Sequence, residues 1–128
     1  MEIEIKKQTT NRSSLLNVAV ESLEKFKAQD IVKIDLSGKT SIADFMLIAS
    51  GTSSRQIRAM AEHTVTMIKK NIKAPVNIEG LNQGDWVLID SGDIIIHLFR
   101  PEVREFYNLE KMWQINSIQD TKIENLEI

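Results

Sequence analysis

Five consecutive apolar residues, from Phe45 to Ala49, constrain the fold of this chain more than any other feature. An alternating pattern of apolar and polar residues is typical of a strand with one face in water, whereas an unbroken apolar run is typical of a strand covered on both faces. Such a strand belongs to a sheet with helices packed against it. The segment from Asp44 to Ser50 therefore predicts a buried strand in an α/β fold.

A helix start follows this strand directly. Gly51 and Thr52 lead into Ser53, and Gln56 stands three residues after Ser53, which is the spacing of a capping box. Apolar side chains then recur at steps of three and four residues, which predicts a helix that lies against the sheet with its Arg and Lys side chains outward. This apolar stripe comprises Ile57, Met60, Ala61, Val65, Ile68 and Ile72.

The rest of the chain predicts two more helices and four more strands. The first helix is expected from Ser13, as N-cap, to about Lys27. Pro101 can occupy the first turn of a last helix that reaches Trp113. The strands are expected at Asp30 to Leu36, Val76 to Glu79, Asp85 to Asp90 and Asp93 to Phe99.

Two connections restrict how these strands pair. Ser91 and Gly92 separate the last two strands by a short turn, which predicts an antiparallel hairpin. The strand from Val76 to Glu79 forms a right-handed βαβ unit if it runs parallel to the strand before the helix. The expected fold is a mixed sheet of about five strands flanked by helices, in one domain of residues 1–113. Residues 114–128 form a C-terminal tail without a strong pattern, which is compatible with disorder.

The composition excludes several classes of protein. The chain has no cysteine, which excludes disulfides and cysteine-ligated zinc and fits a reducing compartment, so a cytoplasmic location is expected. No apolar run approaches the roughly 20 residues that a membrane span requires. The 16 basic and 18 acidic residues give a net charge of −2, which argues against extensive direct binding of nucleic acid.

The charges are unevenly distributed along the chain. The segment from Ser53 to Lys73 has five basic residues and one acid, whereas the segment from Val76 to Trp113 has three basic residues and seven acids. A molecule with one basic helix and an acidic far end can meet a basic protein through its acidic side, although two ordinary solvated faces explain the same distribution.

Three signals for catalysis or ligand binding also have structural interpretations. Backbone N–H groups and hydroxyls from Gly51 to Ser54 could bind a phosphate, yet a tight turn and a helix cap explain the same residues. Asp90 and Asp93 could hold a metal ion, but they flank the predicted turn, where acids commonly stabilise the backbone. Because His63 and His97 stand on separate elements, zinc is not expected. His97 is predicted to be packed within its strand, and it could act as a base only beside a carboxylate.

Aromatic residues are concentrated near the end of the chain, among acidic residues. Trp86 follows a polar loop that could present it at the surface, and core packing is the alternative. Phe99 and Phe106 are expected in the core. The segment as a whole predicts a binding surface for a basic protein rather than a catalytic site. Its aromatic members are Trp86, Phe99, Phe106, Tyr107 and Trp113.

Several motifs of the chain closely resemble those of the ribosomal silencing factor family RsfS, also called the Iojap family. The resemblance runs in order from about Leu16 to Trp113 and leaves little room for insertions. It is carried by DLSGKTSIADF at residues 35–45, GTSSR at 51–55, DWVLID at 85–90, GDIIIH at 92–97 and FYNLEKMW at 106–113.

This resemblance implies a small α/β protein that is similar in fold to nucleotidyltransferases but is not an enzyme and needs no cofactor. The family binds the large ribosomal subunit through ribosomal protein L-fourteen, blocks joining of the small subunit and lowers translation when nutrients are scarce. Carried over by motif, the expected contact residues are Trp86 and Tyr107. The flanking polar candidates on the same last helix are Arg104, Glu110 and Lys111.

Two other hypotheses stay open at the level of the sequence. The chain could be a nucleotidyltransferase or nucleotide-binding enzyme that uses the junction from Gly51 to Ser54 together with Asp90 or Asp93. A homodimer formed through an exposed edge of the mixed sheet is compatible with either function.

Overall fold

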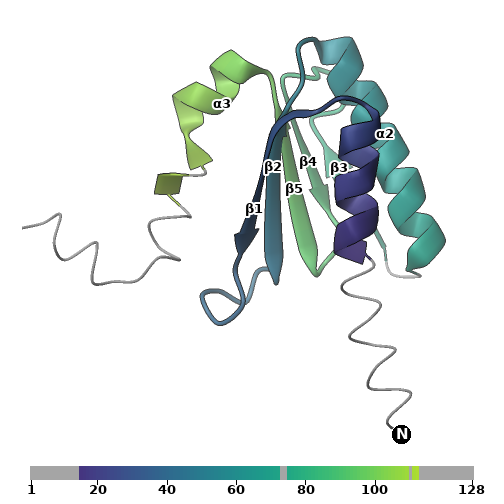
Figure 1. Ribbon diagram of the computed structural model, residues 1–128, viewed down its shortest axis with the longest axis vertical. Coiled ribbons are helices and arrows are strands. Elements are labelled where there is room, and N and C mark those ends of the chain that lie inside the picture. The colour runs from purple at the N-terminus through teal and green to yellow at the C-terminus, as the bar shows by residue number, and fades with distance from the viewer. Residues whose placement is uncertain (1–14, 73–74, 110, 113–128) are drawn as a thin grey trace, which may run out of the picture.

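A mixed sheet of five strands forms the centre of the computed structural model, which describes residues 15–72, 75–109 and 111–112 (Figure 1). The strand order across the sheet is β1-β2-β5-β4-β3. A helix of residues 15–25 precedes the sheet and is called the N-terminal helix below. The other elements are β1 (Gln29–Asp35), β2 (Phe45–Ser50), α2 (Ser54–Asn71), β3 (Asn77–Glu79), β4 (Trp86–Asp90), β5 (Ile94–Phe99) and α3 (Pro101–Tyr107).

The central strand β5 and its parallel neighbour β2 are covered on both faces. The register places Leu47 beside Ile96 and Ile48 beside His97. Leu47 and Ile96 are fully buried on one face of the sheet, and Ile48 is buried on the other. The prediction of a strand covered on both faces is therefore confirmed, as is the mixed five-stranded sheet flanked by helices.

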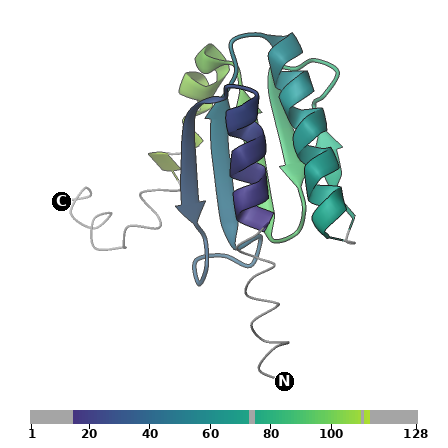
Figure 2. The same cartoon turned by 45° about the vertical axis from the view of Figure 1, so that its right-hand side comes forward.

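The N-terminal helix and α2 lie side by side over one face of the sheet (Figure 2). Their apolar side chains form the larger part of the core with the residues of β2, β4 and β5 that point to this face. The stripe predicted on α2 supplies Ile57, Met60, Ala61 and Ile68, which are all fully buried. Burial of this stripe is what holds α2 against the sheet, since an amphipathic helix gains most of its stability from packing.

The opposite face carries a smaller apolar cluster. The helix α3 lies on this side, at the end of the sheet where β2 and β5 finish (Figure 1). Ile48, Ile95 and Phe99 are buried within the cluster, and Trp86 and Val103 pack against them. Phe99 is fully buried, as its sequence context predicted. This face is consequently the one on which residues of β4, β5 and α3 can meet.

Capping at the start of α2 follows the predicted spacing in one direction only. The Gln56 backbone N–H donates to Ser53 Oγ over 3.1 Å, which confirms Ser53 as the N-cap. The Gln56 side chain accepts the backbone N–H of Thr52 at 2.7 Å, one residue before the position that a capping box uses. Its amide nitrogen also donates to the carbonyl of Phe26 at 2.8 Å, so Gln56 ties the N-terminal helix to the start of α2.

The strand β3 runs parallel to β2, which is the condition set for a βαβ unit, and it lies at the far edge of the sheet against β4. One expectation about the elements needs correction. The last helix does not continue unbroken to Trp113, since Asn108 adopts a left-handed conformation with φ 49° and ends α3 at Tyr107. A separate helical turn follows at 109 and 111–112.

Some expectations fall outside the described residues. They are the Ser13 cap, Glu110, Trp113 and the tail of residues 114–128. The sheet has two edge strands, β1 and β3, and dimerisation through an edge stays a prediction. Among the helices within 15–72, 75–109 and 111–112, none has the length and apolar character to cross a membrane.

Candidate functional site

Trp86 lies at the centre of an aromatic cluster built by three elements. It is the first residue of β4, and its register partner is Phe99, the last residue of β5. The centroid of the Trp86 ring lies 4.9 Å from that of Phe99 and 4.7 Å from that of Tyr107 on α3. These separations are those of favourable aromatic pairs. The cluster thus joins α3 to the second face of the sheet.

A buried histidine fixes the edge of this indole. Trp86 Nε1–H donates to Nδ1 of His97 over 2.9 Å. Burial lowers the pKa of His97 from 6.5 to about 4, because water can no longer stabilise the imidazolium. His97 is therefore neutral at pH 7. Its proton is on Nε2, and the lone pair of Nδ1 accepts the indole N–H. The sequence prediction that His97 is a packed residue is confirmed.

The outer surface of α3 presents apolar side chains to solvent. Phe106 is 80% exposed, Tyr107 is 50% exposed, and Met112 in the following turn is 49% exposed. The rings of Phe106 and Tyr107 meet edge to face with centroids 5.0 Å apart. The expectation of Phe106 in the core is wrong, because α3 turns this side chain away from the sheet. We call Phe106, Tyr107 and Met112 the exposed apolar patch.

Tyr107 connects the exposed apolar patch to the packed rings beneath it. One part of its ring contacts Trp86, and the other half of the side chain is open to solvent. Trp86 itself is half-buried, so it combines the two alternatives left open by the sequence. An aromatic side chain that is rigidly supported and partly exposed is typical of a hot spot for protein binding.

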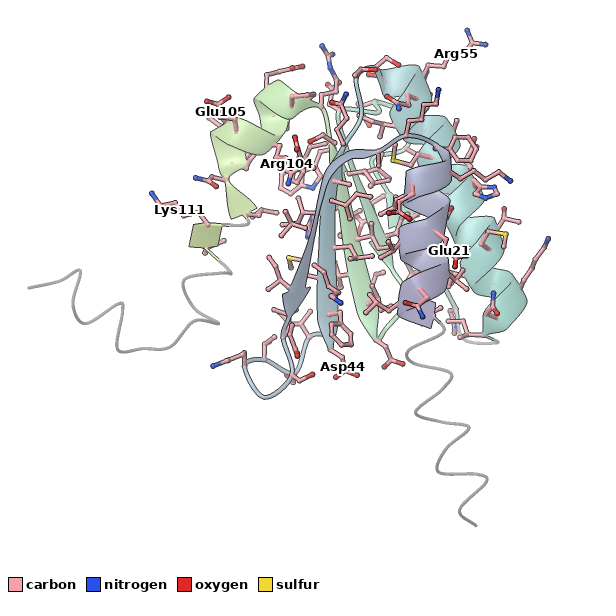
Figure 3. The ribbon with its side chains drawn as sticks, in the orientation of Figure 1. Glu21, Asp44, Arg55, Arg104, Glu105 and Lys111 are labelled. Atoms are coloured by element: carbon pink, nitrogen blue, oxygen red, sulfur yellow. The ribbon has the colours of Figure 1, made fainter. Side chains whose placement is uncertain are left out.

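Arg104 occupies a different position from the one its motif suggested. Its residue is only 8% exposed, and Figure 3 shows the side chain directed from α3 toward the sheet. Nη2 donates to the carbonyl of Asp30 at 2.7 Å, and Nη1 donates to Ser50 Oγ at 2.8 Å. Arg104 therefore fastens α3 to β1 and β2, and its guanidinium does not point to a partner on the surface.

The exposed polar residues near the exposed apolar patch are of both signs. Glu105 and Lys111 point away from the sheet in Figure 3, and both are exposed. Arg100 lies 2.8 Å from Glu102 and 3.5 Å from Asp85 through its side-chain nitrogens, so one basic group near α3 is already paired with acids. The role of Lys111 as a flanking residue stays a prediction, and Glu110 lies outside the described residues.

The side chain of Asp90 and the residues of the junction before α2 stabilise the local backbone. Asp90 Oδ1 accepts the backbone N–H of Gly92 at 2.9 Å, which is the stabilisation of a turn predicted for it. At the junction, Ser53 Oγ caps α2 and the Thr52 hydroxyl donates to Gln56 at 2.9 Å. The described part of the chain has no group of three or more His, Asp or Glu side chains placed to hold a metal ion.

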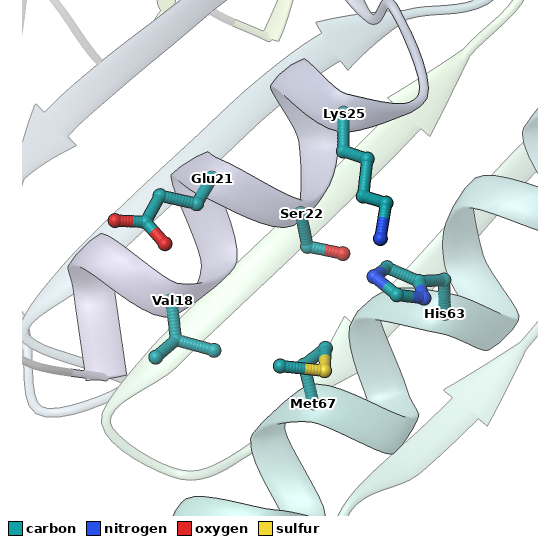
Figure 4. A pocket seen from close by; sticks show the side chains of 6 residues that line it. All are labelled: Val18, Glu21, Ser22, Lys25, His63 and Met67. Atoms are coloured by element: carbon teal, nitrogen blue, oxygen red, sulfur yellow. The ribbon is translucent and has the colours of Figure 1, made fainter.

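A hollow lies between the N-terminal helix and α2, on the face of the sheet opposite the aromatic cluster; Figure 4 shows the side chains that line it. It encloses about 240 Å³ and has an apolar floor of Val18 and Met67. Lys25 and His63 lie side by side on one wall, whereas the carboxylate of Glu21 points away from them. The His63 ring packs on Phe26 with centroids 4.9 Å apart. The described side chains that line this hollow do not form a cluster like the aromatic rings around Trp86.

Comparison with known proteins identifies the family. A family model described as "ribosomal silencing factor during starvation", RsfS, matches residues 8–127. The chain belongs to the RsfS family. This match includes residues 114–127, which the motifs quoted from the sequence do not cover, so the family pattern continues beyond Trp113.

Relatives with known names agree with this membership. The ribosomal silencing factor RsfS of Zymomonas mobilis is 53% identical over 109 residues, which cover 85% of this chain and 82% of that protein. A mouse protein named "Mitochondrial assembly of ribosomal large subunit protein 1" is 39% identical over 82% of this chain and 47% of its own length. A crystal structure of a Chromobacterium violaceum protein is 35% identical and has a TM-score of 0.76, with 80% of this chain and 85% of that chain covered.

Proposed function

We propose that this protein is a ribosomal silencing factor that binds the large ribosomal subunit and keeps the small subunit from joining it. Membership of the RsfS family supports the silencing role, and the name of the mouse relative supports the large subunit as the partner. The expected consequence in the cytoplasm is lowered translation when nutrients are scarce. No chemical step is required, because bound protein occupies space that the small subunit needs.

The observation that carries this proposal is the exposed apolar patch above a rigid aromatic support. Phe106 is 80% exposed and Tyr107 is 50% exposed on the same short helix, and adjoining exposed apolar side chains can mark a site of protein binding. Aromatic residues of this kind supply much of the free energy of protein association when a partner covers them. The patch therefore provides a surface for binding a protein.

We assign the residues of the predicted site different roles in this binding. Tyr107 is the contact residue at the centre, and Lys111 lies at its rim, while Glu110 is kept as a flanking candidate on its motif alone. Trp86 supports Tyr107 from beneath and adds the edge of its indole. Arg104 holds α3 in place through Asp30 and Ser50.

A basic ribosomal protein is the partner that suits this end of the molecule, and ribosomal protein L-fourteen is the candidate implied by the family resemblance. Exposed acids lie on α3 and just before β4, two of them paired with Arg100, and complementary charge favours encounter and orientation. The exposed acids are Glu102 and Glu105 on α3 and Asp85 before β4. Binding through this patch would leave the N-terminal helix and α2 on the opposite side of the sheet.

Co-sedimentation with purified large ribosomal subunits tests the proposal. We expect Tyr107→Ala to weaken binding at least tenfold, because truncating a central aromatic hot spot commonly costs about 2 kcal/mol or more. Thr66→Ala, on the exposed side of α2, is the matched control and should bind like the wild type. Absence of wild-type protein from the subunit fraction contradicts the function, whereas equal binding by folded Tyr107→Ala contradicts the site.

A further inference from the structure

We propose that His97 is a positioning residue for the binding surface, because it holds the indole of Trp86 in the orientation on which Tyr107 packs. The inference rests on the proposed function and assigns a role to a residue that touches no partner. His97 is 9% exposed and lies on the face of β5 that also carries Phe99. Its effect on binding must therefore pass through Trp86.

His97 lies on β5, the most enclosed strand of the sheet, and this strand fixes its position. The strand β5 pairs with β2 on one side and β4 on the other, and His97 has Ile48 and Leu88 as its register partners. The planes of His97 and Phe99 are nearly parallel, with an interplanar angle of 8° and centroids 5.9 Å apart. Because the strand and the Phe99 ring hold the His97 side chain, its Nδ1 acceptor has a fixed position.

The acceptor selects one orientation of the indole. Trp86 has a single N–H donor, and a partly buried donor without an acceptor is costly, so the ring is held with Nε1 toward His97. The same ring lies 4.7 Å from Tyr107, at an interplanar angle of 43°. Rotation of the indole would therefore remove the surface that supports Tyr107 and shift the contact residue on α3.

The other contacts of Trp86 do not replace this hydrogen bond. Phe99 and Tyr107 contact the ring through aromatic surfaces, and such contacts tolerate sliding and rotation better than a directional N–H bond does. His97 is thus the directional element of the cluster. Binding should respond to the acceptor at residue 97 and not only to the volume that residue fills.

Variants of His97 separate these two contributions in the full-length protein. His97→Leu keeps a similar volume and removes the acceptor, whereas His97→Asn is smaller but can place its Oδ1 near the position of Nδ1. We expect His97→Leu to bind large ribosomal subunits about fivefold to tenfold more weakly than the wild type, the effect of one hydrogen bond. His97→Asn should recover part of this loss despite its poorer packing.

A double-mutant cycle with Trp86→Phe identifies the route of the effect. This variant keeps an aromatic ring and lacks the indole donor, so in its background His97→Asn should lose its advantage over His97→Leu. If His97→Leu does not fold, Trp86→Phe and His97→Asn still test the proposal. Equal binding by folded His97→Leu and the wild type would overturn the proposal, as would a loss that is the same in the Trp86→Phe background.

The indole N–H resonance in a ¹H–¹⁵N spectrum gives a readout that a merely structural role would not move. We expect the signal of Trp86 to shift toward that of a free indole in His97→Leu and to remain near its original position in His97→Asn. The chain has two tryptophans, and the signal that Trp86→Phe removes is that of Trp86. An unchanged Trp86 signal in His97→Leu overturns the positioning role alone, whereas failure of the wild type to bind subunits overturns the proposed function as well.

Discussion

Arg104 shows how much of the candidate surface depends on a residue that does not lie on it. Its guanidinium reaches from α3 to the Asp30 carbonyl on β1 and to the Ser50 hydroxyl on β2. Each of these acceptors belongs to a strand far from α3 in the sequence. The short helix α3 has only seven residues, so tertiary bonds of this kind are needed to hold it.

Replacement of this residue should therefore destabilise the protein. We expect Arg104→Ala to lower the free energy of unfolding by about 2 to 3 kcal/mol, because it removes charge-assisted hydrogen bonds and leaves the buried Ser50 hydroxyl without this donor. Arg100→Ala is the matched control, since Arg100 pairs with Asp85 and Glu102 near the surface and should contribute less than about 1 kcal/mol. Urea unfolding measures both, and equal losses would contradict the anchoring role.

Residue positions on α3 were the hardest to predict from the sequence. Tyr107 and Phe106 are adjacent aromatic residues, and which of them faces Trp86 depends on how α3 leaves β5. Arg104 looked like a surface residue because burial of an arginine needs acceptors that only the folded chain brings together. By contrast, Phe99 and His97 were placed correctly, since an apolar strand fixes the surroundings of its members.

At the scale of elements, the turn between β3 and β4 brings the chain to Trp86. Gly80 has φ 80°, and a Cβ atom added there would lie 2.2 Å from the carbonyl oxygen of Trp86. The turn between β4 and β5 contains Gly92, which has φ 92° and open space around the same position. The two glycines thus share an unusual conformation and differ in how closely another part of the backbone approaches.

Alanine substitutions should separate these two effects. Gly92→Ala is expected to cost about 1 to 2 kcal/mol from the left-handed conformation alone. Gly80→Ala carries the same strain and must also move the backbone of Trp86, so its loss in thermal stability should be clearly larger. A Gly80→Ala protein as stable as Gly92→Ala would show that the start of β4 adjusts freely.

Strands and helices were predictable where one local pattern decided them. The apolar run of β2, the cap at Ser53 and the turn at Gly92 each fixed an element within a residue or so. The place of β3 at the far edge could not be predicted, because a crossover can skip strands without any local sign. The end of α3 depends on the left-handed conformation of Asn108, and no glycine or proline at this point of the sequence indicates it.

At the scale of the whole molecule, the sheet separates two unlike sides. The N-terminal helix and α2 lie over one face, and α3 lies on the side of the other (Figures 1 and 2). The first face has a continuous core, whereas the second carries the aromatic cluster and the exposed apolar patch. The uneven charge of the sequence follows this division in part, with α2 on the basic side and the acids of α3 beside the patch. Such a molecule can bind a partner through the side that carries the exposed apolar patch, while the N-terminal helix and α2 on the other side occupy the space beside that partner.

The most direct test of this account is to mix large and small ribosomal subunits with the protein and follow their association on a sucrose gradient. We predict that wild-type protein migrates with the large subunit and reduces the joined fraction in proportion to occupancy, while Tyr107→Ala has little effect at the same concentration. Normal joining on large subunits that are saturated with the wild-type protein would contradict silencing by steric exclusion.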